Sequence, residues 1–303
     1  QMPIMHQPAG LTHVWRWHND YGYDCGFESV FYPADGEYHN GEGIHIPSNP
    51  DVPDVIDGAW HEGGYSHEYG HHWQSVFAPQ PPFDYFNGVC DGDPPTPPGG
   101  HCYWCWELGS IVVLEGFPGV LGDIVPRDLQ LDYGLPIIGV DTSEMIWPCY
   151  DHWDDPNTTE GFYCALLRDI WDSAQDSHGH FGTWQDRIAE GPGEILAVTH
   201  LDNPQSPLAF LGALRARYPG INTENLWETA MNCGYDFDAA APGVVTGLHS
   251  TSHSVNVSSP DQTIDLSWTT ASDDASGIAG YGIFVTHSAS LPSATMDIGD
   301  VTH

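Results

Sequence analysis

The chain has 303 residues, of which 40% are hydrophobic and 12% aromatic, so a buried core is expected and a disordered chain is not. Acidic residues outnumber basic ones by 42 to 6, and the formal net charge is −36 at pH 7. This charge repels phosphate groups, which argues against nucleic acid or an anionic membrane surface as a partner. The length accommodates one medium-sized domain and a smaller second one.

Cysteine usage predicts an oxidising compartment, and therefore a secreted or cell-surface protein with disulfide bonds. The number of cysteines is odd, so one of them has no partner within the chain. Proximity in the sequence suggests Cys90 with Cys102 or Cys105, and Cys149 with Cys164. No apolar run is long enough to span a membrane, and no signal peptide follows Gln1, as expected for a mature or trimmed form. The seven cysteines are Cys25, Cys90, Cys102, Cys105, Cys149, Cys164 and Cys233.

The first fifty residues are rich in aromatics, glycine and histidine, and predict irregular structure with short strands at 29–32 and 43–46. A helix is expected next, because apolar residues recur at helical spacing across residues 55–77. A proline- and glycine-rich loop at 78–101 follows it. Further helices are predicted at 103–125, with a pause at 116–118 next to a proline, and at 159–176, 206–218 and 223–233.

Beyond a linker at 239–243 the sequence becomes rich in serine and threonine and alternates polar with apolar residues. This pattern predicts strands at 254–257, 264–268 and 281–285. The segment Leu266-Ser267-Trp268 and the run at 273–281 resemble a fibronectin type III or immunoglobulin-like module. Such a β-sandwich needs roughly 100 residues, so residues 242–303 would form an incomplete one. The predicted domains are therefore residues 1–241 and 242–303.

The chemistry of the chain centres on His67 and His71, which are four residues apart within a predicted helix. On a helix this spacing places both imidazoles on one face, where they can reach one cation at about 2.0–2.1 Å. Glu68 can approach the water on such an ion and act as the general base of a metallopeptidase, which is the H-E-x-x-H arrangement. The simpler alternative is a polar helix surface, but the apolar flanks and a downstream glutamate favour the metal interpretation.

A third protein ligand is expected on a second helix, because the extended motif with a third histidine after a glycine is absent. The candidates are Glu115, which we favour, and Glu107, whose simpler role is a first-turn carboxylate at a helix N-terminus.

The segment Leu114-Glu115-Gly116-Phe117 resembles the gluzincins, a group of zinc peptidases that contains thermolysin and whose third ligand lies in a Glu-Gly-Phe-Ala context. Pro118 replaces the usual alanine. The resemblance covers roughly residues 40–180. It implies an α+β fold, with a mainly helical zincin catalytic domain and a short N-terminal sheet, and it implies Zn²⁺ as the cofactor.

The resemblance also implies a tyrosine or histidine that donates a hydrogen bond to the oxyanion of the substrate. By position, Tyr163, His178 and His180 are candidates for the donor, with a packed tyrosine and surface histidines as the alternative. Asp169 or Asp172 could orient a ligand histidine through its other ring nitrogen, and a structural carboxylate is the alternative for each.

The predicted function is zinc-dependent hydrolysis of peptide bonds in extracellular proteins or peptides. One alternative is a non-catalytic cell-surface or adhesion protein that retains a metal site, with the β-module binding a surface, a glycan or another protein. Another is a carbohydrate-active protein that stacks sugars on Trp15, Trp17, Trp104 and Trp106. Structural Ca²⁺ is considered at three acidic clusters, where a solvated surface is the simpler interpretation. These clusters are Asp91 with Asp93; Asp151 with Asp154 and Asp155; and Asp172 with Asp176.

Overall fold

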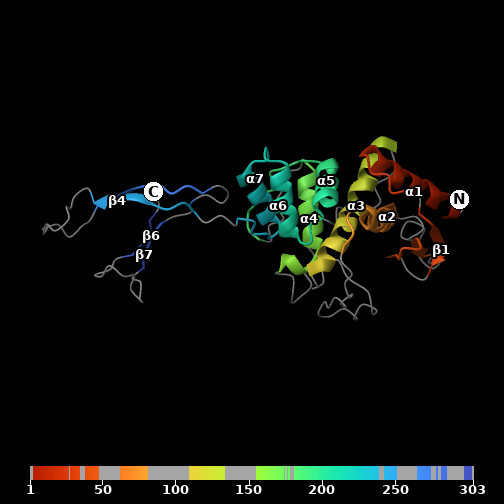
Figure 1. The fold of residues 1–303 in the computed structure, drawn as a ribbon, viewed down its shortest axis with the longest axis horizontal. Helices are drawn as coiled ribbons and strands as arrows, with labels where there is room; N and C mark the ends of the chain where they lie inside the picture. Colours follow the sequence, from red (N-terminus) through yellow and green to blue (C-terminus); the bar gives the residue numbers. More distant parts are fainter. Residues whose placement is uncertain are drawn as a thin grey trace. The chain divides into compact units, whose positions relative to one another are not determined.

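The chain divides into two compact units, Gln1–Phe237 and Asp238–His303, and each is described by itself. The fold comes from a computed structural model (Figure 1). It describes residues 3–26, 28–34, 38–47, 62–80, 109–133, 155–173, 175, 177, 181–238, 242–250, 265–273, 278, 281–284 and 297–301.

The first unit begins with helix α1 (Pro3–Asp20), where the sequence predicted irregular structure. Val14, Trp17 and His18 are buried on this helix. Gly10 allows a close approach to helix α2, because a Cβ at this position would lie 2.9 Å from Cδ2 of Tyr65. Helices of this length gain most of their stability from tertiary packing, which local composition does not reveal.

A three-stranded sheet follows α1, with β3 (Ile44–Pro47) in the middle. This strand pairs parallel with β1 (Val30–Ala34) and antiparallel with β2 (Tyr38–His39). The strands predicted at 29–32 and 43–46 are confirmed to within two residues. Ile44 and Ile46 are buried and belong to the hydrophobic core of this unit.

Helices α2 (Glu62–Phe77) and α3 (Gly109–Tyr133) pack against each other and position the candidate site. The predicted pause at 116–118 is wrong, because α3 continues through Pro118 and Pro126. Proline removes one helical hydrogen bond, but packing against the neighbouring helices holds α3 together. Pro118 itself is buried.

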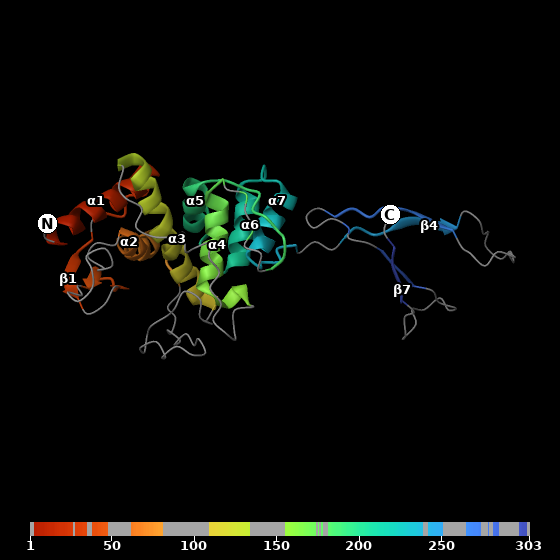
Figure 2. The ribbon, with the colours of Figure 1, turned by 180° about the vertical axis from the view of Figure 1, so that it is seen from behind.

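The remaining helices of the first unit pack beyond α3, as both ribbon views show (Figure 1, Figure 2). The predicted helix at 159–176 ends early, and the helix at 192–202 was not predicted. The helices predicted at 206–218 and 223–233 are confirmed to within one residue at each end. The helices that follow α3 in the first unit are η2 (Pro156–Thr158), α4 (Glu160–Trp171), α5 (Pro192–Asp202), α6 (Pro207–Arg217) and α7 (Thr223–Asn232).

A buried arginine joins α3 to α4. Arg168 is 4% exposed, and its Nη1 lies 3.4 Å from Oδ2 of Asp123 on α3. Its Nε lies 3.1 Å from Oδ2 of Asp172, and its guanidinium carbon lies 4.1 Å from the ring centroid of Trp171. The two carboxylates and the indole ring together compensate for the loss of water around this charge.

The second unit contains two antiparallel strand pairs, and the described residues show no β-sandwich. The strands predicted at 264–268 and 281–285 overlap β5 and β6, while the one predicted at 254–257 lies outside the described residues. The backbone N–H of Ala271 donates to the hydroxyl of Tyr281, whose ring contacts Trp268. The pairs are β4 (Thr246–Ser250) with β5 (Leu266–Thr269), and β6 (Tyr281–Phe284) with β7 (Asp297–Val301).

A search of the described helices for a stretch long and apolar enough to cross a lipid bilayer finds none.

Candidate metal centre

Helix α2 presents His67 and His71 on one face, as the four-residue spacing predicts. Their Nε2 atoms lie 3.1 Å apart. Both side chains retain some exposure, 23% for His67 and 14% for His71, so the pair borders solvent.

Glu115 on α3 completes a group of three potential ligands. Its Oε2 lies 3.0 Å from Nε2 of His71 and 3.5 Å from Nε2 of His67. A tetrahedral zinc ion with ligands at about 2.0–2.1 Å holds its ligand atoms about 3.3 Å apart. The three atoms therefore have the spacing that one divalent ion requires.

Close packing of α2 on α3 brings the three side chains together. A Cβ at Gly70, inside the H-E-x-x-H segment, would lie 3.0 Å from Cα of Pro118. A Cβ at Gly122 would lie 2.9 Å from the carbonyl oxygen of Gly63. Because glycine lacks this atom, the two backbones approach more closely than larger residues would permit.

The backbone around Glu115 is held from both sides. On the α2 side, Nε2 of Gln74 donates to the carbonyl oxygen of Val113 at 3.2 Å. On the α4 side, Sγ of Cys164 donates to the carbonyl oxygen of Gly116 at 3.0 Å. These contacts fix the part of α3 that carries the carboxylate.

Glu68 follows the first histidine on α2 and is 4% exposed. Its side chain is thus enclosed by protein, unlike those of the two partly exposed histidines.

Tyr163 is fully buried on α4 and lies against Gly116 of α3. A Cβ at Gly116 would lie 2.8 Å from Cδ1 of Tyr163, and the tyrosine ring also contacts Phe210. Burial raises the pKa of its phenol above the usual value, and its hydroxyl has no hydrogen-bond partner among the described residues. With no exposed surface, Tyr163 is packed inside the protein in this structure, which agrees with the alternative named for it.

The two aspartates expected to orient a ligand histidine do not contact one. Asp169 accepts hydrogen bonds from Nδ2 of Asn232 at 2.9 Å and from Sγ of Cys233 at 3.3 Å. Asp172, at the C-terminal end of α4, pairs with Arg168 one turn earlier on the same helix. Both carboxylates thus have structural contacts, which is the alternative named for them.

Other candidates are engaged elsewhere or lie outside the described residues. The indole N–H groups of Trp15 and Trp17 donate to Asp24 and Asp128, and Trp17 is buried. Asp155 accepts from the backbone N–H of Asn157 and caps η2. The residues outside the described part of the chain are Asp91, Asp93, Trp104, Trp106, Glu107, Asp151, Asp154, Asp176, His178 and His180.

Three cysteines lie in the described part of the chain, and Cys25, Cys164 and Cys233 are all present as thiols. The pair suggested between Cys149 and Cys164 is therefore not formed in this structure. Cys90, Cys102, Cys105 and Cys149 lie outside the described residues, so disulfide bonds among them stay a prediction.

Comparisons with family models, with curated proteins and with solved structures found no match for this chain. The case for a function therefore depends on the geometry of its own side chains.

The structure also assembles a group that the sequence analysis did not find, namely Glu28, His39 and His72. The sequence patterns predicted metal ligands at the paired histidines with a downstream glutamate and at three acidic clusters, and none of these includes Glu28, His39 or His72. Glu28 precedes β1, His39 lies on β2 and His72 on α2, and no local pattern links these positions.

Proposed function

We propose that the first unit is a zinc metallopeptidase of gluzincin type that hydrolyses peptide bonds in extracellular proteins or peptides. The observation that carries the proposal is the convergence of Nε2 of His67, Nε2 of His71 and Oε2 of Glu115, each within 3.5 Å of the other two. Two imidazoles and one carboxylate are a donor set that suits zinc.

The number of ligands favours a catalytic site over a structural one. Structural zinc sites have four protein ligands, whereas catalytic sites have three and leave one position for water. The described residues supply three ligands here, and the partial exposure of both histidines gives that position access to solvent. A zinc ion held by these three residues would lower the pKa of a bound water toward about 7 and would polarise the substrate carbonyl.

Glu68 has the role of general base in this proposal. It adjoins His67 on α2, and its enclosed carboxylate accepts the proton of the attacking water and passes it to the leaving amine.

The remaining parts of the proposal rest on composition and on sequence resemblance. The seven cysteines support a secreted or cell-surface location. The second unit is proposed to be part of a fibronectin type III or immunoglobulin-like module that binds a surface, a glycan or another protein.

A non-catalytic protein that retains the metal site is the second candidate. The burial of Tyr163 favours it, because the only described candidate for the oxyanion donor is not accessible to a substrate. The two candidate functions differ in the activity expected of one variant.

Glu68→Gln tests the choice between them. In a peptidase this variant keeps its zinc and loses hydrolysis of a peptide library by several orders of magnitude, because only the base is removed. The matched control is Glu224→Gln, at an exposed position on α7, which should retain full activity. Hydrolysis that survives Glu68→Gln or complete zinc chelation would refute the proposal, and a zinc-loaded wild type that cleaves nothing would favour the second candidate.

A further inference from the structure

A second group of metal-ligating side chains lies where the segment after α1, strand β2 and helix α2 meet. It consists of Glu28, His39 and His72, and one potential ligand atom from each lies within 4.8 Å of the other two. It shares no residue with the group formed by His67, His71 and Glu115.

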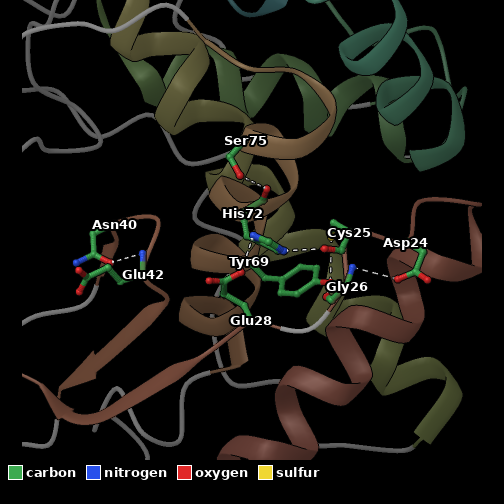
Figure 3. Close-up of polar contacts among 9 residues, drawn as sticks. All are labelled: Asp24, Cys25, Gly26, Glu28, Asn40, Glu42, Tyr69, His72 and Ser75. Atoms are coloured by element: carbon green, nitrogen blue, oxygen red, sulfur yellow. Dashed lines mark hydrogen bonds and ion pairs between the residues drawn. The ribbon is translucent and has the colours of Figure 1, made fainter.

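The two ring nitrogens of His72 have the contacts that are common for a histidine bound to a metal ion. Its Nε2 lies 3.0 Å from the carbonyl oxygen of Cys25, and a hydrogen bond there places the ring proton on Nε2. Its Nδ1 then faces Oε2 of Glu28 at 2.9 Å (Figure 3). Histidine ligands typically donate their other N–H to a carbonyl, which fixes the tautomer and aims the free lone pair at the ion.

The third potential ligand is a ring nitrogen of His39. Its Nε2 is buried and has no hydrogen-bond partner among the described residues. Its ring centroid lies 5.7 Å from that of His72.

The backbone that carries Glu28 is fastened to α2 before any ion binds. The hydroxyl of Tyr69, one turn before His72, donates to the carbonyl oxygen of Gly26 at 2.9 Å. Sγ of Cys25 donates to the same hydroxyl at 3.0 Å, and Figure 3 shows both residues beside the imidazole of His72. Such supporting contacts hold the ligands close to their final geometry and lower the free-energy cost of binding.

We propose that Glu28, His39 and His72 form a second binding site for a divalent transition-metal ion, for which zinc is the best match. Two imidazole nitrogens and one carboxylate oxygen are the donors that this ion prefers. Binding draws the three atoms from separations of up to 4.8 Å to the about 3.3 Å of a tetrahedral site. The ion would then cross-link β2, the segment before β1 and helix α2.

The ordinary alternative is an ion pair between Glu28 and His72, with His39 as a buried neighbour. In that case the protein binds no ion at this position. The two interpretations differ in the number of metal ions that each chain holds.

Metal content decides between them. The full chain, stripped of metal, loaded with Zn²⁺ and dialysed, should contain two equivalents by elemental analysis. His39→Gln and, separately, Glu28→Gln should each contain one, and His67→Gln combined with His39→Gln should contain none. His45→Gln, which removes an imidazole from neighbouring β3, should retain two equivalents.

The result remains interpretable when the proposed peptidase site fails. If only the second site binds, the wild type holds one equivalent, and His39→Gln loses it while His67→Gln does not. A thermal melt of each variant shows that it is folded, and added zinc should raise the Tm of His67→Gln but not that of the double variant. A full complement of metal in both His39→Gln and Glu28→Gln would overturn the proposal.

Discussion

Gly70 of α2 lies directly against Pro118 of α3, so closely that a Cβ at position 70 would be 3.0 Å from the proline Cα. Gly70 lies between the two candidate zinc-binding histidines, His67 and His71, and Pro118 lies three residues after Glu115 on α3. The distance between the helices at this contact therefore sets the distance between the ligands.

Gly70→Ala should force the two helices apart. We expect a loss of about 1–3 kcal/mol in the free energy of unfolding, because the new methyl group meets backbone that has little room to move. Zinc affinity should fall together with stability, and denaturant unfolding with a competitive zinc titration would measure both.

Gly212→Ala is the matched control for Gly70→Ala. It lies inside α6, where a Cβ would have no heavy atom within 4 Å. Alanine there should stabilise the protein by about 0.5–1 kcal/mol, since it restricts the unfolded chain more than glycine does. Equal effects at the two positions would contradict the close-packing argument.

Glu115→Gln should weaken zinc binding at the proposed catalytic site by about 100-fold or more, because a neutral amide replaces the only anionic ligand while the side-chain volume stays the same. Titration against a chromophoric chelator would measure the change. Glu194→Gln, on α5, should leave the affinity unchanged. Wild-type affinity in Glu115→Gln would exclude this carboxylate as a ligand.

The free energy of unfolding should decrease as the pH is lowered, because His18 is buried in its neutral form. Burial, with a smaller contribution from His72, lowers the pKa of His18 from 6.5 to about 3. Below about pH 6.5 the unfolded chain therefore binds a proton that the folded chain does not, and stability decreases until about pH 3, by up to about 1.4 kcal/mol per pH unit.

His18→Phe should remove this one-proton contribution while keeping a ring between Tyr69 and Trp73. Urea unfolding at several pH values between 7 and 4.5 would give the slope. His249→Gln, at an exposed position, should leave the slope at its wild-type value. A slope that is the same in His18→Phe and the wild type would show that His18 is not buried as described.

Arg168→Gln should destabilise the first unit by about 2–4 kcal/mol, because it removes the buried cation beside Asp172 and breaks the link to Asp123, which keeps its ion pair with Arg127. Arg187→Gln is the control, since Arg187 pairs with Glu228 at the surface and should cost less than about 1 kcal/mol. Thermal unfolding of both variants tests the difference.

Local patterns in the sequence were sufficient to predict the helices that carry the proposed catalytic site. A spacing of four residues was enough to place His67 and His71 together, and the context of Glu115 identified the side chain that meets them. The same reasoning missed α1, whose stability comes from packing of Gly10 on Tyr65, a contact between distant parts of the chain.

Roles that depend on long-range contacts were not predictable. Asp169 was expected near a ligand histidine, but its partners Asn232 and Cys233 lie more than sixty residues away. The group of Glu28, His39 and His72 has no sequence signature, since three separate elements contribute one residue each.

Helix α2 carries His71 and His72 as consecutive residues, about 100° apart around the helix axis. Each belongs to a different group of potential ligands, so both groups share one stretch of backbone. A rotation of α2 about its axis would therefore move both imidazoles relative to their groups at the same time. An insertion or deletion of a single residue before position 71 would therefore be expected to disrupt both groups at once.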